Sequence, residues 1–394
     1  MPQKTVTDIE GVYASAASCG IKPGRNDLAY LYVPQAYAAA GVFTRNKFRA
    51  ACIEHTAACL AKGTLKALVV NSGNANAVTG DQGLVNAGRT AALAASLLGL
   101  QQNEVAVAST GIIGRQLPMG KIEEGLRRLL ASPHLRHGQL AAEAIMTTDT
   151  RPKQVYLQRE IAGRIITVAG MAKGSGMIAP NMGTMLAFLA TDAKIVHSGL
   201  QSSLVSAVDE SFNMTSVDTD TSTNDMALLF ATGAQAIPGD GAVCAEFTAL
   251  LTEACITLAK MIAADGEGAT KLIEVALHGA LNKEQARQLA LNIINSPLFK
   301  AAVHGADPNW GRVLAALGKN PALDVRPERV DLFFGSQQIL SKGEILDYNV
   351  DAVRKILSRA EISIIVDLNL GDASARAWGC DLTKEYVEIN TSYN

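Results

Sequence analysis

The sequence predicts a mixed fold of helices and strands, α/β or α+β, with its elements stacked in layers. Short apolar runs rich in β-branched residues alternate along the chain with stretches rich in alanine and leucine, an order typical of packed sheets and helices. The chain has 394 residues, of which 48% are hydrophobic and 18% are charged. That is enough for one large domain or two smaller ones with a substantial core.

Strands are expected where a short apolar run ends at a turn signal. Ser72-Gly73 is expected to close the first such run, and Thr110-Gly111 the second. Helices are expected where small or aliphatic residues recur at helical spacing. The predicted strands are 65–71, 104–109, 164–170, 185–190 and 227–232, and the predicted helices are 84–98 and 200–212.

The character of the sequence changes near residue 281, where we expect a smaller α/β domain that continues to about residue 380. The main domain then comprises about 1–280 and the C-terminal tail. A charged amphipathic helix is ended by Ser296-Pro297, and Pro308 is expected in the first turn of the next helix. The predicted elements are helices over 282–295 and 308–317 and strands over 330–334 and 362–367.

Composition and charge argue against several kinds of binding partner and against secretion or membrane insertion. The net charge of −2 comes with no basic stripe, which argues against nucleic acid and anionic membranes as partners. No apolar run reaches the roughly 18 residues of a membrane span, and 91–100 comes nearest. Residues 1–11 carry acidic side chains and lack the apolar core of a signal peptide, so we expect a cytoplasmic protein.

The cysteines and histidines do not form metal-binding patterns. The six cysteines contain no CxxC pair, and in a chain without a secretion signal they are expected to be reduced core thiols. The six histidines show neither HxxxH nor HExxH spacing. We therefore expect no metal.

One segment stands apart from the rest of the sequence. Residues 173–190 read KGSGMIAPNMGTMLAFLA, so a loop with glycines at 174, 176 and 183 and a proline at 180 runs into an apolar strand that begins at Thr184. A threonine hydroxyl is a weak nucleophile and needs an adjacent base. If the chain breaks before Thr184, its new α-amine, with a pKa of about 8, is such a base.

The same hydroxyl is suited to making the cut. Attack of Thr184 Oγ on the Gly183 carbonyl would give an ester that water hydrolyses. Gly183 has no Cβ, which eases a strained approach of the backbone.

Two other interpretations of this segment are available. The first is a surface hairpin in which Thr184 is an ordinary strand residue. The second takes Gly174 to Ala179 as the GxGxxA fingerprint of a dinucleotide site. The second is disfavoured, because Pro180 would break the binding helix and the next strand leaves no room for a crossover helix.

Motifs along the whole chain carry a resemblance to a known family. The chain is similar to the ornithine acetyltransferases, also called glutamate N-acetyltransferases, of the arginine pathway. The departure from the family pattern is Gly183, where the family usually has alanine. The matching strings are NSGNANAVTGDQG (71–83), VASTGIIGRQLPM (107–119), AIMTTDTRPK (144–153), KGSGMIAPNMGTMLAFLATDA (173–193), SVDTDTSTND (216–225), ADGEGATK (264–271), HGADPNWGR (304–312) and YVEIN (386–390).

The resemblance implies a fold and an assembly. The fold is an α-β-β-α sandwich of the N-terminal-nucleophile and aminopeptidase class, with a second, smaller α/β domain. Self-cleavage between Gly183 and Thr184 would give an α chain of 1–183 and a β chain of 184–394, which associate as a heterotetramer of two of each.

The resemblance also assigns the catalytic residues. Thr184 would be the nucleophile that carries the acetyl group. Thr110 and Gly111 would form the oxyanion hole. A hydroxyl and a backbone N–H at the end of a strand suit this role, and one such donor is worth about 3 kcal/mol in the transition state.

Further residues match substrate contacts of the family. Thr147, Lys173 and Asn390 are among them, and Lys173 is suited to a substrate carboxylate. Glu267 in a glycine-flanked loop suits an ammonium group of ornithine. Whether Asn394 or its carboxylate completes the site stays open. By contrast, we expect Asn309, Trp310 and Arg312 to cap a helix at the domain junction.

These parts predict a two-step exchange. N-acetylornithine acetylates Thr184, ornithine leaves, and glutamate then takes the acetyl group. The exchange needs no ATP and no cofactor. Use of acetyl-CoA as a second donor, and service to a secondary pathway instead of arginine synthesis, are left open by the sequence. The alternatives in function are a hydrolase or aminopeptidase of the same fold and a non-catalytic binding protein.

Overall fold

The computed structural model describes residues 4–179, 185–238 and 241–391. The predicted cleavage site, Gly183 and Thr184, lies outside the described residues, as does Asn394. The chain forms two compact units. The first comprises residues 1–174, 180–213 and 220–258, and the second comprises 175–179, 214–219 and 259–394.

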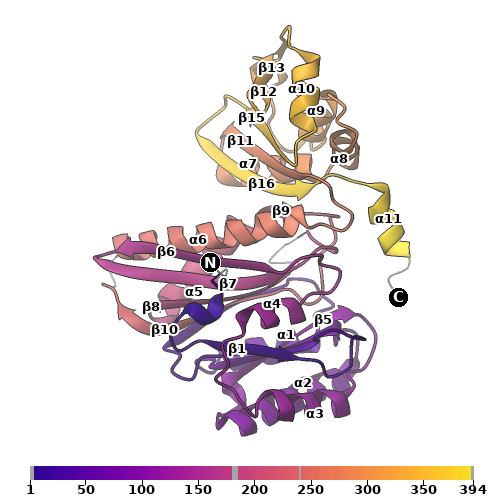
Figure 1. Cartoon of the computed structure of the whole chain (residues 1–394). Coiled ribbons are helices and arrows are strands. Elements are labelled where there is room, and N and C mark those ends of the chain that lie inside the picture. Colours follow the sequence, from indigo (N-terminus) through magenta and orange to yellow (C-terminus); the bar gives the residue numbers. More distant parts are fainter. Residues whose placement is uncertain (1–3, 180–184, 239–240, 392–394) are drawn as a thin grey trace. The chain divides into compact units, whose positions relative to one another are not determined.

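The described residues of the first unit form two stacked sheets (Figure 1). The first sheet has the order β1 (Tyr13–Ala17), β2 (Leu28–Tyr32), β4 (Ala67–Asn74), β5 (Val105–Ile112). In this sheet β4 and β5 run parallel, and the other neighbours are antiparallel. The second sheet has the order β3 (Ala38–Phe43), β10 (Met226–Ala236), β8 (Leu186–Lys194), β7 (Arg164–Lys173), β6 (Lys153–Ile161). In this sheet β8 and β10 run parallel, and the other neighbours are antiparallel.

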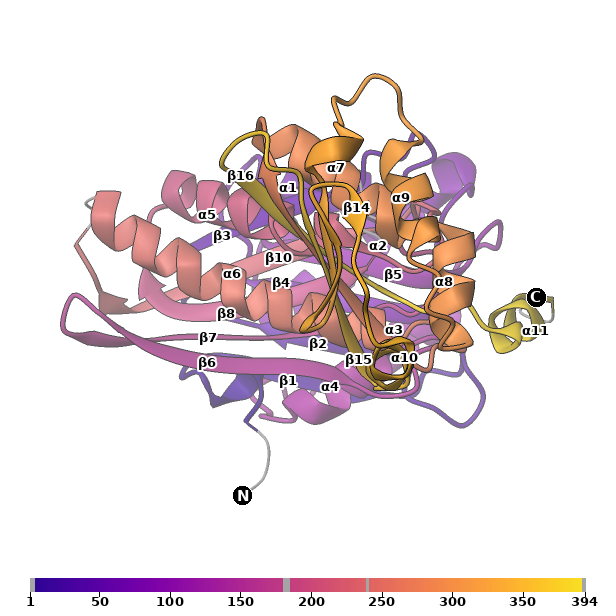
Figure 2. The ribbon, with the colours of Figure 1, turned by 90° about the horizontal axis from the view of Figure 1, so that it is seen from above.

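Helices cover both sheets of this unit. They are α1 (Ala51–Leu60), α2 (Gly80–Leu98), α3 (Met119–Leu129), α4 (Gly138–Ala144), α5 (His197–Asp209) and the first part of α6 (Gly241–Ala264). Helices α2 and α3 lie against the first sheet, whereas α5 packs on β3 and β10. Figure 2 shows α6 lying across the second sheet. Arg159 of β6 and Glu253 of α6 form an ion pair of 2.6 Å there.

A single apolar core joins the two sheets. Its buried side chains include Tyr30 and Val69 from the first sheet and Phe188, Leu228 and Phe230 from the second. These apolar side chains thus pack between the two sheets, as in a sandwich core. The predicted sandwich is confirmed.

The described residues of the second unit contain a mixed sheet. Its order is β14 (Glu344–Ile345), β13 (Gln337–Ser341), β12 (Asp331–Phe334), β15 (Glu361–Asp367), β11 (Leu272–Ala280), β16 (Ala373–Cys380), β9 (Thr215–Ser216). Helix α7 (Lys283–Ile294) packs on β11 and β16, and α10 (Val350–Leu357) on β12. The remaining helices are α8 (Pro297–His304), α9 (Gly311–Gly318) and α11 (Lys384–Thr391).

Side-chain caps explain where several of these helices begin. The Asn282 side chain accepts a hydrogen bond from Gln285 N at the start of α7. Ser296 caps α8 in the same way, with Pro297 in its first turn. Such caps satisfy backbone donors that a helix leaves free, each worth about 1 kcal/mol. The expected boundary near 281 was wrong, because β11 pairs with β15 and β16. The continuous part of the second unit is 259–394, so it includes the C-terminal residues that were expected in the main domain.

Two predicted strand ends were wrong. Ser72-Gly73 and Thr110-Gly111 do not end their strands but lie within β4 and β5. Gly73 and Gly111 pair across these parallel strands, where the missing side chains allow the backbones to approach closely. The prediction for Pro308 was also wrong, because α9 begins at Gly311 after Trp310 as its N-cap.

The expected nearest approach to a membrane span was also wrong. Part of α6, Val243–Ala264, is long and apolar enough by length and composition alone, although half of the qualifying window is buried. Its buried residues include Phe247 and Leu251, which marks a core helix.

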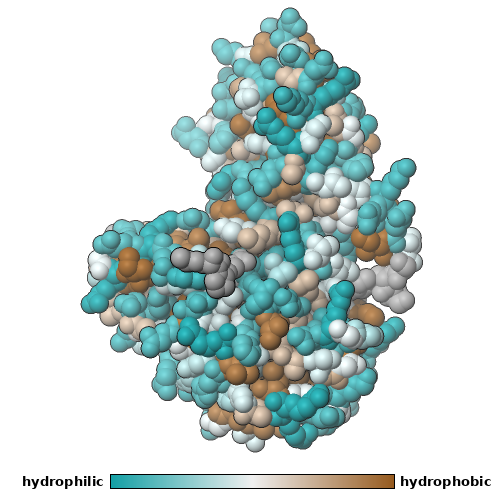
Figure 3. Space-filling model, viewed as in Figure 1, coloured by the Kyte–Doolittle hydropathy of each residue, from teal (hydrophilic) through white to brown (hydrophobic). Residues whose placement is uncertain are grey.

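On the face seen in Figure 3, apolar residues are scattered among polar ones. Five of the cysteines are buried and Cys244 is partly exposed.

Truncation of Leu228 tests the joint core. Leu228 is fully buried between the sheets, and we expect Leu228→Ala to lower the free energy of unfolding by about 2–5 kcal/mol. Ile165 of β7 is a matched control, because its side chain is 53% exposed, and Ile165→Ala should cost about 1 kcal/mol or less. Urea denaturation measures both, and equal losses would contradict the packing described.

Candidate active site

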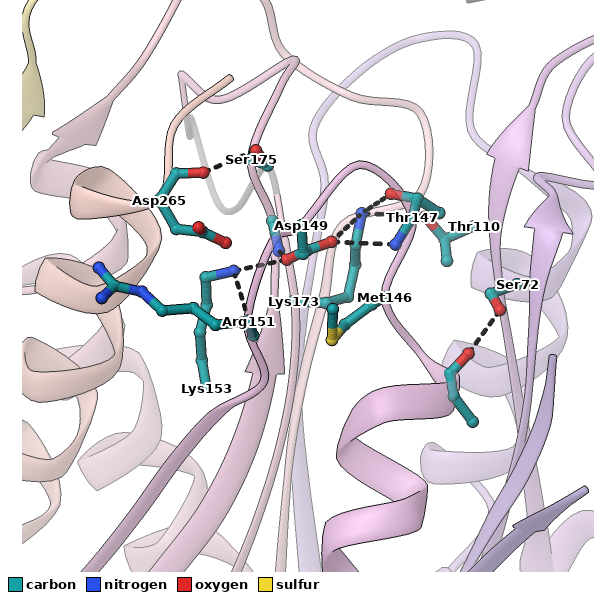
Figure 4. Close-up of polar contacts among 12 residues, drawn as sticks. Ser72, Thr110, Met146, Thr147, Asp149, Arg151, Lys153, Lys173, Ser175 and Asp265 are labelled. Carbon is teal, nitrogen blue, oxygen red and sulfur yellow. Dashed lines mark hydrogen bonds and ion pairs between the residues drawn. The ribbon is translucent and has the colours of Figure 1, made fainter. Parts of the chain in front are cut away.

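A buried carboxylate between two lysines dominates the end of β7 (Figure 4). Asp149 Oδ1 accepts a hydrogen bond of 2.7 Å from Lys153 Nζ and another of 2.7 Å from the Gly174 backbone N–H. Its Oδ2 accepts one of 3.0 Å from Thr147 N and lies 3.9 Å from Lys173 Nζ. Asp149 and Lys153 are both fully buried, so this pair is a rigid part of the interior.

The charges of this cluster act on the pKa of Asp149. Burial would raise it, but the ammonium groups of Lys173 and Lys153 and the hydrogen bonds outweigh burial and lower it to about 2. Asp149 is therefore ionised throughout the physiological range. Its negative charge compensates two buried positive ones, which is the condition under which lysines are buried at all.

Lys173 connects this cluster to two hydroxyl groups. Its Nζ donates to Thr147 Oγ1 at 2.8 Å and to Thr110 Oγ1 at 3.4 Å. Lys173 is 7% exposed and Thr110 is 9% exposed, so the contacts are shielded from water. The structure thus brings together three of the residues singled out in the sequence: Thr110, Thr147 and Lys173.

Gly111, the other predicted oxyanion residue, lies beside Thr110 in β5. Its φ angle is +132°, and an added Cβ would overlap the backbone of Gly73 and Asn74. Only glycine satisfies both the dihedral angle and the close approach of β4. The close contact with β4 therefore fixes the position of the Gly111 backbone N–H and leaves no space for a side chain.

Asn224 holds this end of β5 to the second sheet. It lies two residues before β10, and its Nδ2 donates to Ser109 O at 2.8 Å and to Ala75 O at 2.6 Å. Ser109 Oγ in turn donates to Asn71 Oδ1 at 2.7 Å. This network holds Ser109, the residue before Thr110, from Asn71 of β4 on one side and from Asn224 on the other.

Side chains from other parts of the chain hold the turn that carries Thr147 by bonding to its backbone carbonyls. Ser72 Oγ donates to Ala144 O at 2.5 Å (Figure 4), and Lys22 Nζ donates to Met146 O at 2.8 Å. Burial lowers the pKa of Lys22 to about 8, with Asp27 acting in the opposite direction. These bonds satisfy the last carbonyls of α4 and set the position of Thr147.

In the second unit, Glu267 and Asn390 form a pair. Asn390 Nδ2 of α11 donates to Glu267 Oε2 at 2.8 Å. Glu267 is 8% exposed, and its carboxyl lies so close to Gly176 that a Cβ there would overlap it. The two predicted substrate contacts of this unit therefore lie together, and a loop glycine makes room for the carboxylate.

Comparison with known proteins accounts for these features. The ArgJ family profile matches residues 13–394. The Arginine biosynthesis bifunctional protein ArgJ of Symbiobacterium thermophilum is 47% identical over 98% of this chain and 98% of its own length. The protein of the same name from Dehalococcoides mccartyi is 46% identical over 100% of this chain and 98% of its own. The crystal structure of Arginine biosynthesis bifunctional protein argJ from Bacillus halodurans is 42% identical, covers 53% of this chain and all of its own, and has a TM-score of 0.51.

The chain belongs to the ArgJ family. The predicted family and the predicted acetyl transfer in arginine biosynthesis are confirmed. The alternatives of a hydrolase and of a non-catalytic binding protein are not favoured.

The dinucleotide interpretation of Gly174 to Ala179 is overturned by the sheet. A dinucleotide site needs a helix that connects parallel strands, but β7 and β8 are antiparallel neighbours. The loop segment 175–179 is instead held by the Asp218 carboxylate. Asp218 accepts hydrogen bonds from Met177 N at 2.6 Å and from Ile178 N at 2.8 Å.

The predicted helix-capping triplet has mixed outcomes. Trp310 is the N-cap of α9, but its side chain makes no capping bond and donates from Nε1 to Tyr348 Oη at 3.1 Å. Arg312 donates to Leu298 O at 2.6 Å, which ties α9 to α8. These contacts lie within the second unit and give the triplet a structural role there.

Sequence reasoning missed Asp149, Lys153 and Asn224. All three lie in strings that were recognised as family motifs, AIMTTDTRPK and SVDTDTSTND. The available signal was an acidic residue four positions before a lysine in a stretch that also contains a candidate substrate contact. Nothing in that spacing indicates that both side chains are buried.

If Gly111 belongs to the oxyanion hole as predicted, we expect Gly111→Ala to lower kcat for acetyl transfer by about 10²–10³-fold, because the added Cβ would displace its backbone N–H. Gly114→Ala is the matched control, since Gly114 also has a positive φ but open space around it. Steady-state kinetics on both variants, with melting temperatures, measure the difference. Equal kcat values would refute the role of this close approach.

Asp149→Asn should remove a pH-dependent contribution to stability. The folded pKa of Asp149 is depressed, so its contribution is complete above the unfolded pKa near 4 and is lost as pH falls from there towards 2. At pH 7 the variant removes the Asp149 charge from beside two buried ammonium groups, which costs about 3–5 kcal/mol. Denaturation at several pH values should show this difference shrinking below about pH 4. Asp351→Asn, whose side chain is 89% exposed, should show no such change.

Proposed function

We propose that Thr184 is the nucleophile of this acetyltransferase and that the chain frees it by cutting its own Gly183–Thr184 bond. Leu186 pairs with Lys173 in the register of β8 and β7, and Thr184 precedes Leu186 by two residues. Consecutive Cα atoms are about 3.8 Å apart, so the chain tethers Thr184 within about 8 Å of the Leu186 Cα atom. This tether to the Lys173 end of the sheet is the observation that carries the proposal.

The proposed cut is an acyl shift. Thr184 Oγ attacks the Gly183 carbonyl carbon, the peptide C–N bond breaks, and an ester to Gly183 forms while the α-amine of Thr184 is released. Water then hydrolyses the ester, which leaves a carboxylate on Gly183 and a free hydroxyl on Thr184. The products are the proposed α chain, 1–183, and β chain, 184–394.

Acetyl transfer then uses the freed amine as base. It takes the proton of the Thr184 hydroxyl as Oγ attacks the acetyl carbonyl of N-acetylornithine, and it returns that proton to the departing ornithine amine. The oxygen that becomes negative is stabilised by the Thr110 hydroxyl and the Gly111 N–H. Glutamate attacks the acetyl ester in the reverse sense and leaves as N-acetylglutamate.

Lys173 supports the oxyanion role of Thr110. Its ammonium donates to Thr110 Oγ1 and so occupies an acceptor position of that oxygen, which leaves the hydroxyl proton available for the substrate. The adjacent positive charge also favours a developing oxyanion in a site with little water. Thr147, held by the same ammonium, is proposed as a polar contact for the substrate.

Glu267 and Asn390 are proposed to bind the polar groups of the amino-acid substrates. The Glu267 carboxylate has an Asn390 partner at one oxygen and suits an ammonium group of ornithine. The related proteins are named bifunctional, and we propose acetyl-CoA as the second acetyl donor of this chain. We further propose a heterotetramer of two α and two β chains in the cytoplasm.

Intact mass and N-terminal sequencing of the purified protein, beside Thr184→Ala, test this mechanism. Wild type should give chains of about 19 and 22 kDa, the shares of 41.4 kDa in proportion to residues 1–183 and 184–394, and the variant should stay whole. The larger chain should begin Thr-Met-Leu-Ala. A whole wild-type chain that still transfers acetyl groups would overturn the proposed nucleophile. Assays with N-acetylornithine or acetyl-CoA as donor to glutamate then separate one activity from two.

A further inference from the structure

The short segment that follows β16 holds the loop that carries Glu267. This loop, 265–271, connects α6 to β11, and residues 381–383 connect β16 to α11. Both segments belong to the second unit, so their contacts lie within one compact part of the chain. Asp381 and Thr383, which make these contacts, have no part in the site described so far.

Asp381 anchors the end of the loop that leads into β11. Its Oδ1 accepts hydrogen bonds from Thr270 N at 2.8 Å and from Lys271 N at 2.9 Å. Its Oδ2 accepts one from Thr270 Oγ1 at 2.6 Å and lies 2.9 Å from His304 Nδ1. Burial would raise the pKa of Asp381, but the hydrogen bonds from Thr270, His304 and Lys271 outweigh burial and lower it. An ionised carboxylate bonded at both oxygens therefore fixes this end of the loop.

Thr383 connects the middle of the loop to α11. Its Oγ1 donates to Gly268 O at 2.9 Å and accepts from Tyr386 N at 3.2 Å. The second bond is an N-terminal cap, because α11 begins at Lys384, directly after Thr383. Gly268 has a φ of +67°, and an added Cβ would overlap the backbone N of Tyr386. The loop and the first turn of α11 are thus in direct contact, with one hydroxyl bonded to both.

The same helix carries Asn390 near its other end. Asn390 Nδ2 donates to Glu267 Oε2 at 2.8 Å and to Tyr386 O at 2.9 Å. None of the eight described residues of α11 is buried, and a helix of that length has little stability of its own in water. The position of α11 therefore depends on polar contacts, and Thr383 bonds to Gly268, the residue next to Glu267.

We propose that Thr383 is a positioning residue that holds α11 on the Glu267 loop, so that Glu267 and Asn390 meet an ammonium group of the substrate as one preformed pair. The inference rests on the proposed function, in which these two residues bind the substrate. An ammonium group donates up to three hydrogen bonds, and the carboxylate together with the Asn390 carbonyl oxygen supplies acceptors for them. A preformed pair loses less conformational freedom on binding, so loss of the Thr383 hydroxyl should weaken binding.

The two amino-acid substrates differ in the group that such a pair recognises. The side chain of N-acetylornithine ends in an ammonium group, whereas that of glutamate ends in a carboxylate. A displaced Glu267–Asn390 pair should therefore affect KM for N-acetylornithine more than KM for glutamate. A general loss of stability would affect both substrates alike.

Thr383→Val tests the proposal, because valine keeps the branched shape of threonine but lacks the hydroxyl. We expect KM for N-acetylornithine to rise about 10-fold, while kcat and KM for glutamate change by less than about twofold. Thr383→Ser keeps the hydroxyl and should behave like wild type. Asn349→Ala is the matched control, because it removes the cap of α10, which packs on β12 in the same unit. This control should lower the melting temperature without raising either KM.

A second measurement follows α11 directly. Amide hydrogen exchange in residues 384–391 should be faster in Thr383→Val than in wild type, and unchanged in Asn349→Ala. Wild-type exchange in Thr383→Val overturns the hold on α11. If Thr383→Val does not fold, Gly268→Ala carries the test, because its Cβ would separate the loop from the helix. A folded Gly268→Ala enzyme with the wild-type KM for N-acetylornithine then overturns the proposal.

Glu267→Gln separates this inference from the proposed function. We expect it to raise KM for N-acetylornithine, since an amide is a weaker acceptor for ammonium than a carboxylate. If Glu267→Gln raises this KM and Thr383→Val leaves it unchanged, the substrate contact stands and the role of Thr383 is overturned. If Glu267→Gln leaves it unchanged in an active enzyme, the proposed substrate contact is itself wrong, and the inference that rests on it falls as well.

Discussion

The ionised Asp149 carboxylate, buried between Lys153 and Lys173, is the constraint on which the first unit's site depends. Lys153 forms the close contact at 2.7 Å, whereas Lys173 stays at 3.9 Å. This asymmetry matters, because the longer separation leaves the N–H donors of Lys173 for hydroxyl groups. The Asp149 carboxylate still balances the charge of Lys173 at this distance, while the ammonium group donates hydrogen bonds to the hydroxyl groups of Thr110 and Thr147. The desolvation of three charged groups, several kcal/mol each, is tolerable only while the whole cluster remains intact.

The proposed oxyanion residues are held in place in a similar way. Gly111 is held against Gly73 by the parallel pairing of β4 and β5, and Asn224 bonds to the carbonyl of the preceding Ser109. Donors fixed in this way need no reorganisation when charge develops on a substrate, which is the main source of oxyanion stabilisation. Lys173 belongs to the second sheet and Asn224 precedes the start of its strand β10 by two residues, so the core that stacks the sheets also affects the geometry of these donors.

The sequence predicts strands and helices, which come from periodic patterns, better than it predicts contacts between individual residues. The periodic apolar runs indicated β4, β5, β7, β8 and β10 and helices α2, α5 and α7 within a few residues. Gly73 and Gly111 misled because glycine usually signals a turn, whereas here it marks a close approach between strands that are 38 residues apart in the chain. The burial of Asp149 and Lys153 depends on which strands become neighbours. Local spacing carries no information about that.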